Sequence, residues 1–70
     1  MNPDRLVYMA NQIAKGFRLK SEDRAVADTL DHIQKFWEPR MRREILAVLA
    51  AGGDGLEPIA RKAVEQIKVS

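Results

Sequence analysis

The sequence predicts an all-α fold, a small bundle of four short helices in a single domain. Apolar residues recur at intervals of three and four in four successive stretches, which is the spacing of one face of a helix. Prolines and glycines separate these stretches at positions where helices begin and end. No alternating apolar and polar run predicts a strand. The domain is expected to span residues 1–70, with helices over about residues 3–17, 22–37, 39–51 and 57–68.

The first helix is expected to begin at Pro3, because a first helical turn does not use the N–H that proline lacks, and Asn2 before it is a suitable N-cap. Its buried stripe consists of Leu6, Met9, Ile13 and Phe17. Gly16 weakens the last turn and marks its end. Asn11 leaves two interpretations open: a solvated or locally bonded side chain, or one that hydrogen-bonds the backbone of a partner.

The second helix is expected to begin after Ser21, whose hydroxyl is a good acceptor for a backbone N–H of the first turn. Its narrow apolar seam consists of Val26, Leu30, Ile33 and Trp37. His32 lies at the edge of this seam, one turn after Asp28. We interpret His32 as a partly buried structural histidine held by a carboxylate or a backbone carbonyl, rather than as an acid–base residue or a ligand.

The stretch over residues 32–43 predicts a corner between two helices and holds the single histidine, the single tryptophan and three arginines. The residue before a proline is displaced from the α region, so the second helix should end near Trp37 and the third should begin at Pro39. We expect Phe36 and Trp37 to pack inside this corner. The side chains expected on its outer side are Arg40, Arg42 and Arg43.

The third helix has its apolar side chains at Met41, Ile45, Val48 and Leu49. One of the next two glycines, Gly52 or Gly53, is expected to end the helix in the left-handed conformation. The run Gly53-Asp54-Gly55 lacks the Lys-Ser/Thr pair of a phosphate-binding loop and follows no strand, so we interpret it as a connector.

The fourth helix is expected to begin with Glu57 as its cap and Pro58 at its first position. Arg61 has the spacing for ion pairs with Glu57 and Glu65. The core of the whole bundle is expected to contain Leu6, Ile13, Val26, Leu30, Ile33, Ile45, Leu49 and Ile67.

The composition limits the class of protein. The 70 residues carry 12 basic and 10 acidic side chains, a formal charge of +2 that is mild for binding nucleic acid or an anionic membrane. With no cysteine and one histidine, we expect no metal site and no redox cofactor in this chain. No apolar run approaches the roughly 20 residues of a membrane span, and no signal pattern opens the chain, so we expect a cytoplasmic location.

The residues favour an interaction protein over an enzyme. Catalysis needs a nucleophile with a base, paired carboxylates in a cleft or a metal, and none is evident. The alternative is a small helical nucleic-acid-binding protein of the helix-turn-helix kind, or a regulatory protein, because Lys35 and the three arginines cluster at a helix start. Apolar residues separate these arginines, however, and no asparagine or glutamine stands beside them to read bases. Arginine, tryptophan and methionine together are typical of protein–protein interfaces.

The corner motif reads His-Ile-x-x-Phe-Trp-x-Pro-Arg-Met-Arg over residues 32–42. It is preceded by Met-Ala-Asn-Gln-Ile-Ala at residues 9–14 and followed by Ala-Gly-Gly-Asp-Gly-Leu-Glu-Pro at residues 51–58. In this order and spacing, the motifs resemble the small delta subunit of cytoplasmic NAD-dependent formate dehydrogenases that contain molybdenum or tungsten. Gly16 departs from the family pattern, which has a bulkier residue there.

The resemblance implies an accessory subunit that binds the large catalytic subunit and supports its assembly, cofactor insertion or stability. It also implies that the molybdenum or tungsten pterin, the iron–sulfur clusters and FMN are held by the other subunits, which oxidise formate and reduce NAD+. Self-association of an isolated copy is left open. The residues expected to bind the partner are Asn11, His32, Phe36, Trp37, Pro39, Arg40, Met41, Arg42 and Arg43.

Overall fold

The computed structural model describes residues 2–68 and contains, in this part of the chain, four α-helices and no strand. The all-α bundle expected from the sequence is therefore confirmed. Residues 1, 69 and 70 of the expected domain lie outside the described residues. The helices are α1 (Pro3–Gly16), α2 (Glu22–Phe36), α3 (Pro39–Ala50) and α4 (Pro58–Val64).

The helices begin where local capping chemistry predicts. The side-chain oxygen of Asn2 accepts the N–H of Asp4 at 2.8 Å. The hydroxyl of Ser21 accepts the N–H of Arg24 at 3.3 Å, which satisfies a backbone donor of the first turn of α2. Proline is the first residue of three helices, α1, α3 and α4.

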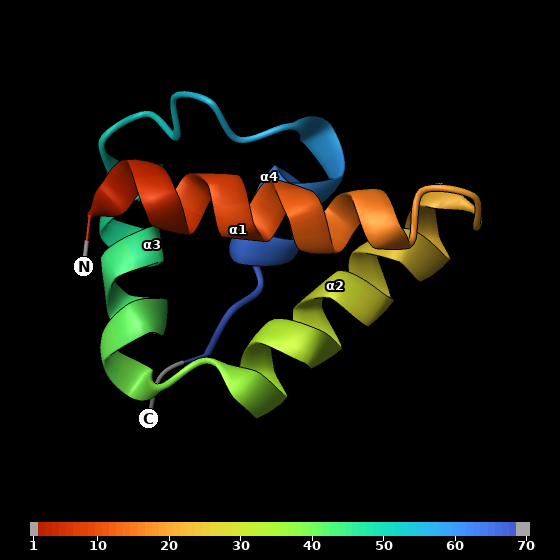
Figure 1. The fold of residues 1–70 in the computed structure, drawn as a ribbon, viewed down its shortest axis with the longest axis horizontal. Coiled ribbons are helices and arrows are strands. Elements are labelled where there is room, and N and C mark those ends of the chain that lie inside the picture. Colours follow the sequence, from red (N-terminus) through yellow and green to blue (C-terminus); the bar gives the residue numbers. More distant parts are fainter. Residues whose placement is uncertain (1, 69–70) are drawn as a thin grey trace.

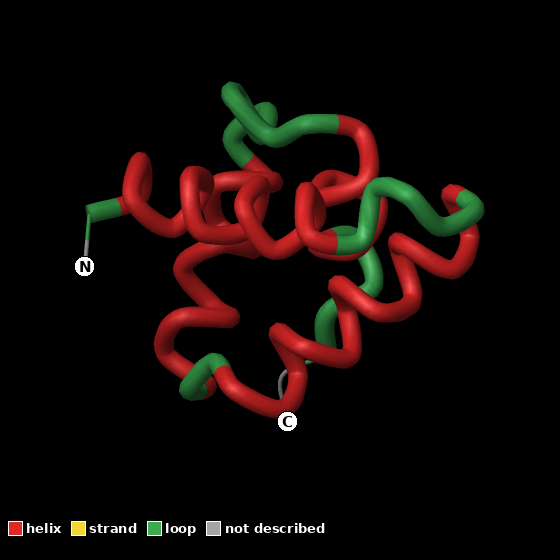
Figure 2. Tube along the Cα trace, turned by 45° about the vertical axis from the view of Figure 1, so that its right-hand side comes forward, coloured by secondary structure: helices red, strands yellow, loops and turns green. Residues whose placement is uncertain are grey.

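The four helices wrap around a small core without forming a parallel bundle (Figure 1). α4 lies behind α1, while α2 and α3 leave their common corner in different directions. A turned view shows the same divergence (Figure 2). α2 packs mainly on α4, and α3 packs on α1 and α4 but hardly on α2. The space between α2 and α3 is crossed by the segment that follows α4 (Figure 1).

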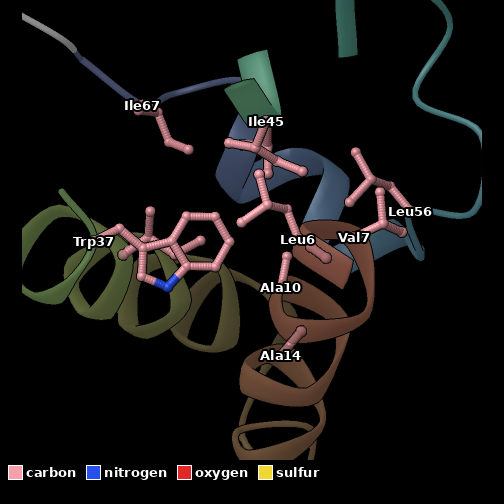
Figure 3. Close-up of a cluster of buried hydrophobic side chains, with 11 residues drawn as sticks. Leu6, Val7, Ala10, Ala14, Trp37, Ile45, Leu56 and Ile67 are labelled. Carbon is pink, nitrogen blue, oxygen red and sulfur yellow. The ribbon is translucent and has the colours of Figure 1, made fainter. Parts of the chain in front are cut away.

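The core is built from small as well as large side chains (Figure 3). Of the predicted core, Leu6, Val26, Ile33, Ile45 and Ile67 are buried. Ile13, Leu30 and Leu49 are partly buried and pack against this core from its edge. Three alanines, Ala10, Ala14 and Ala60, are buried in the cluster. Small side chains at these positions allow α1 and α4 to pack against each other.

The fourth helix was expected over about residues 57–68. Its expected end is wrong, because α4 ends at Val64. The N–H of Ile67 bonds to the carbonyl of Val64, three residues back, at 3.1 Å, which is a tighter turn than an α-helix makes. The N–H of Lys68 then bonds to Oε1 of Gln34 in α2 at 2.9 Å. This tertiary bond replaces a helical one, and it holds the segment after α4, with its buried Ile67, against α2.

The other three helices end one residue before their expected ends. Phe17, Trp37 and Ala51, which were expected to be the last helical residues, are instead the C-cap residues of α1, α2 and α3. α3 then closes with a pair of hydrogen bonds typical of the Schellman motif. The N–H of Gly53 bonds to the carbonyl of Val48 at 2.9 Å, and that of Gly52 bonds to the carbonyl of Leu49 at 3.0 Å.

Candidate partner-binding site at the corner of α2 and α3

The corner is formed by a change in backbone conformation at Trp37. This residue has φ −86° and ψ 135°, which is extended, and its N–H still bonds to the carbonyl of Ile33 at 3.0 Å. Glu38 is also extended, as expected for a residue before a proline, and α3 begins at once at Pro39. Two extended residues, Trp37 and Glu38, therefore separate the helices. Some side chains of this corner are buried in the core and others face solvent.

Trp37 is the internal anchor of the corner. Its side chain is 5% exposed, and its indole points from the end of α2 into the cluster that contains Leu6 and Ile45 (Figure 3). The expectation that Trp37 packs inside the corner is confirmed. A buried tryptophan holds the junction through its large apolar area, so a direct role in binding a partner would require a rearrangement of the core.

Phe36 lies on the outside of the corner, so the expectation that it packs inside was wrong. Its side chain is 70% exposed. Successive helical residues point about 100° apart, so Phe36 faces solvent once Trp37 faces the core. The ring of His32 lies against Phe36, with centroids 4.8 Å apart and planes tilted by 44°. The two rings form one aromatic surface at the end of α2.

His32 has a different neighbour from the one expected. The carboxylate of Asp28, one turn before it, pairs with Lys20 and Arg24 instead. The hydrogen bond from Lys20 is the main cause that lowers the pKa of Asp28 below its ordinary value. The half-buried His32 therefore contacts an aromatic ring at the corner, and Asp28 ties the α1–α2 loop to α2.

Arg42 belongs to the inside of the corner, which corrects its expected place on the outer side. The residue is half-buried, and its Nη1 donates to the carbonyl of Gln34 in the last turn of α2 at 2.9 Å. The last carbonyls of a helix have no partner within the helix, so this bond satisfies one of them. Arg42 thus fastens the start of α3 to the end of α2.

The exposed arginines of the corner are Arg40 and Arg43. Nε of Arg40 lies 3.6 Å from Oε1 of Glu44, a loose i,i+4 pair on the surface. Met41, which lies between Arg40 and Arg43 in the sequence, is half-buried and packs against the core. We use the name corner surface for the outward-facing residues of this region, which are His32, Phe36, Pro39, Arg40 and Arg43.

Asn11 does not lie at the corner. Its Nδ2 donates to the carbonyl of Gly55 at 2.9 Å, and its Oδ1 accepts the N–H of Glu57 at 3.0 Å. Both bonds go to the loop between α3 and α4, which lies on the far side of α1 from the corner (Figure 1). Asn11 is not locally bonded, because its side chain holds backbone groups of its own chain that are 44 and 46 positions away.

Arg61 has a structural role that the spacing of charges did not reveal. Its Nη2 donates to the carbonyls of Gly52 and Gly53 at 3.0 and 2.9 Å, and the ion pairs expected with Glu57 and Glu65 are not formed. A Cβ on Gly53 would lie 2.9 Å from the guanidinium nitrogens. The glycine pair after α3 was the available signal, since helix ends of this kind leave carbonyls exposed to a cation.

Within residues 2–68, no group of three or more His, Cys, Asp or Glu side chains is arranged to hold a metal ion. None of the helices described is long and apolar enough to cross a membrane.

Comparison with known families gives a match over most of the chain. The model of a family described as "NADH-dependant formate dehydrogenase delta subunit FdsD" matches residues 5–64, a range that includes all four helices except the first two residues of α1. No curated protein and no solved structure matches the chain.

Proposed function

The chain belongs to the NADH-dependent formate dehydrogenase delta subunit family, and we propose that it is a non-catalytic accessory subunit of such an enzyme. It binds the large catalytic subunit and supports its assembly, cofactor insertion or stability. In this proposal the complex is cytoplasmic, and its pterin metal centre, iron–sulfur clusters and FMN belong to the other subunits. The absence of cysteine from the sequence supports this division, because thiolates are the usual cluster ligands.

The family match is the observation that carries the proposal, and the corner surface is the part of the chain that we assign to the catalytic subunit. An exposed phenylalanine beside exposed arginines provides apolar area together with planar donors for carboxylates and carbonyls. The buried Trp37 and the half-buried Arg42 support this surface from within. The inner residues of the corner therefore hold its shape, and its exposed residues are available to contact a partner.

A tagged copy of the chain, expressed in its native cell, tests the proposal. We expect it to capture the large formate dehydrogenase subunit, identified by mass spectrometry. The triple variant F36A/R40A/R43A should lose this capture. The matched control R5A/Y8A/K15A also removes one exposed aromatic residue and two exposed cations, but from α1, and should retain it.

Failure of the unchanged chain to capture the subunit would refute the accessory role. Retained capture by the F36A/R40A/R43A variant would instead move the binding surface away from the corner. A separate measurement concerns chemistry: the purified chain is expected to show neither NAD+ reduction by formate nor a flavin or iron–sulfur absorption spectrum. Either activity or such a spectrum would contradict a non-catalytic subunit.

A further inference from the structure

α3 is the helix that the rest of the chain covers least. Eight of the eleven residues from Met41 to Ala51 are apolar, yet Ile45 is the only one of them that is buried. Leu46, Val48 and Leu49 are partly buried. The cause is topological, because α2 diverges from α3 at the corner and leaves α3 to pack on α1 and α4 alone. Apolar surface therefore remains on the C-terminal half of α3.

This surface forms one side of a groove of about 530 Å³ between α3 and the start of α1. Its apolar lining consists of Val7, Ala47, Val48 and Ala51. Its acidic lining consists of Asp4, Glu44 and Asp54. Alanines at two positions of the lining leave room for the side chains of another molecule.

The charge of the groove is of one sign. None of the described residues that line it is a lysine or an arginine. Glu44 is paired with Arg40, whereas Asp4 and Asp54 form no ion pair with any residue in the described part of the chain. Small-molecule sites usually place several polar groups that converge on a ligand, but here the polar groups are carboxylates beside an apolar surface. Such a combination fits a protein segment with cationic side chains.

We propose that the groove between α1 and α3 docks a segment of the catalytic subunit that presents apolar side chains flanked by lysine or arginine. This inference rests on the proposed function and adds a second contact to it. α3 has 12 residues and is about 18 Å long, with the corner surface at its first turn and the groove along its second half. One partner can therefore contact both the corner surface and the groove along α3. Such a partner would present acidic side chains to the corner surface and basic side chains to the groove.

Photo-crosslinking in the assembled complex identifies the occupant of the groove. A benzophenone amino acid replaces Ala47, which is exposed and lines the groove, and in a control chain it replaces Ala27, which is exposed on α2. We expect the Ala47 variant to crosslink to a peptide of the catalytic subunit that contains apolar residues next to lysine or arginine. A crosslink to a second copy of this chain, a crosslink to a peptide without basic residues, or no crosslink above the Ala27 control would overturn the proposal.

A charge variant tests the complementarity with little change in shape. D4N/D54N removes the two groove carboxylates that form no ion pair within residues 2–68, and D23N/E65Q is the control, since Asp23 has the same first-turn position in α2 as Asp4 has in α1. We expect about tenfold weaker binding of the catalytic subunit by D4N/D54N and a smaller dependence on salt, because exposed charge pairs each contribute a modest attraction that salt screens. Equal binding by both variants would overturn the proposal. If the unchanged chain does not bind at all, the proposed function fails instead.

Discussion

Phe36 and Trp37 are adjacent in the sequence, yet one is 70% and the other 5% exposed. Trp37→Ala would leave a cavity in the cluster around Ile45, so we expect the free energy of unfolding to fall by roughly 3–5 kcal/mol. Phe36→Ala should change it by less than about 0.5 kcal/mol. Urea denaturation followed by circular dichroism measures both. Equal destabilisation by the two changes would contradict the environments described for them.

The arginines of the corner differ in the same way. Arg42→Ala removes the donor to the carbonyl of Gln34, and we expect a loss of about 1.5–3 kcal/mol, the range for a hydrogen bond that involves a charged group. Arg43→Ala, at an exposed position in the same helix, should stay within about 0.5 kcal/mol. Thermal unfolding of the two variants provides the measurement. A stable Arg42→Ala chain would show that this arginine is available to a partner after all.

At the level of helices, two glycines at helix ends should respond to alanine with opposite sign. Gly53 has φ +66°, and a Cβ there would lie 2.9 Å from the guanidinium of Arg61, so Gly53→Ala should destabilise the chain by roughly 1–2 kcal/mol. Gly16 lies in the last turn of α1 with nothing within 4 Å of an added Cβ. Gly16→Ala should therefore raise stability by up to about 1 kcal/mol. Chemical denaturation of the two variants side by side distinguishes the signs.

The α1–α2 loop is tied to α2 by a pair that depends on pH. The hydrogen bond from Lys20, with the charge of Arg24, lowers the pKa of Asp28 in the folded chain below 3.8. A lowered folded pKa adds stability that is fully present above the unfolded value and is lost as the pH falls through the folded value. We expect Asp28→Asn to flatten the decline in stability below about pH 4. An unchanged acid limb of the stability curve would show that the pair contributes nothing.

The sequence predicts helix starts well because their chemistry is local, as the bonds of Asn2 and Ser21 to nearby N–H groups show. It predicts side-chain partners poorly where a loop intervenes. Arg42 and Arg61 each reach carbonyls eight or nine positions away, and no i,i+4 rule contains that information. The helical period places Trp37 in the seam of the second helix, and the structure confirms that it is buried, but the period did not show that Phe36 beside it is exposed. Direct contact of the nine predicted site residues with a partner stays a prediction.

At the scale of the whole molecule, the chain is compact but small. Its radius of gyration is 10.7 Å, close to the roughly 11 Å expected for a folded chain of this length. A domain of this size buries only about 60% of the surface of its unfolded chain, and the weakly covered α3 adds to that shortage. The unbound subunit is therefore expected to have modest stability.

Binding should raise that stability measurably. A partner that binds only the folded chain adds about 2.7 kcal/mol when its free concentration is 100 times the dissociation constant. We expect the melting temperature of the delta subunit to rise by several degrees in the presence of the catalytic subunit, as recorded with a fluorescent label on the small chain. The F36A/R40A/R43A variant should show no such rise at the same concentration.

The two hydrogen bonds from Asn11 to the α3–α4 loop affect the order in which backbone amides become protected from solvent. The amide of Glu57 bonds to a side chain 46 positions earlier, so it is shielded only after α1 has docked. The amide of Arg61, four residues on, bonds to the carbonyl of Glu57 and needs only α4. Hydrogen exchange at these two amides therefore reports two different events within a short stretch of chain. Exchange at Glu57 reports the docking of α1, and exchange at Arg61 reports the formation of α4.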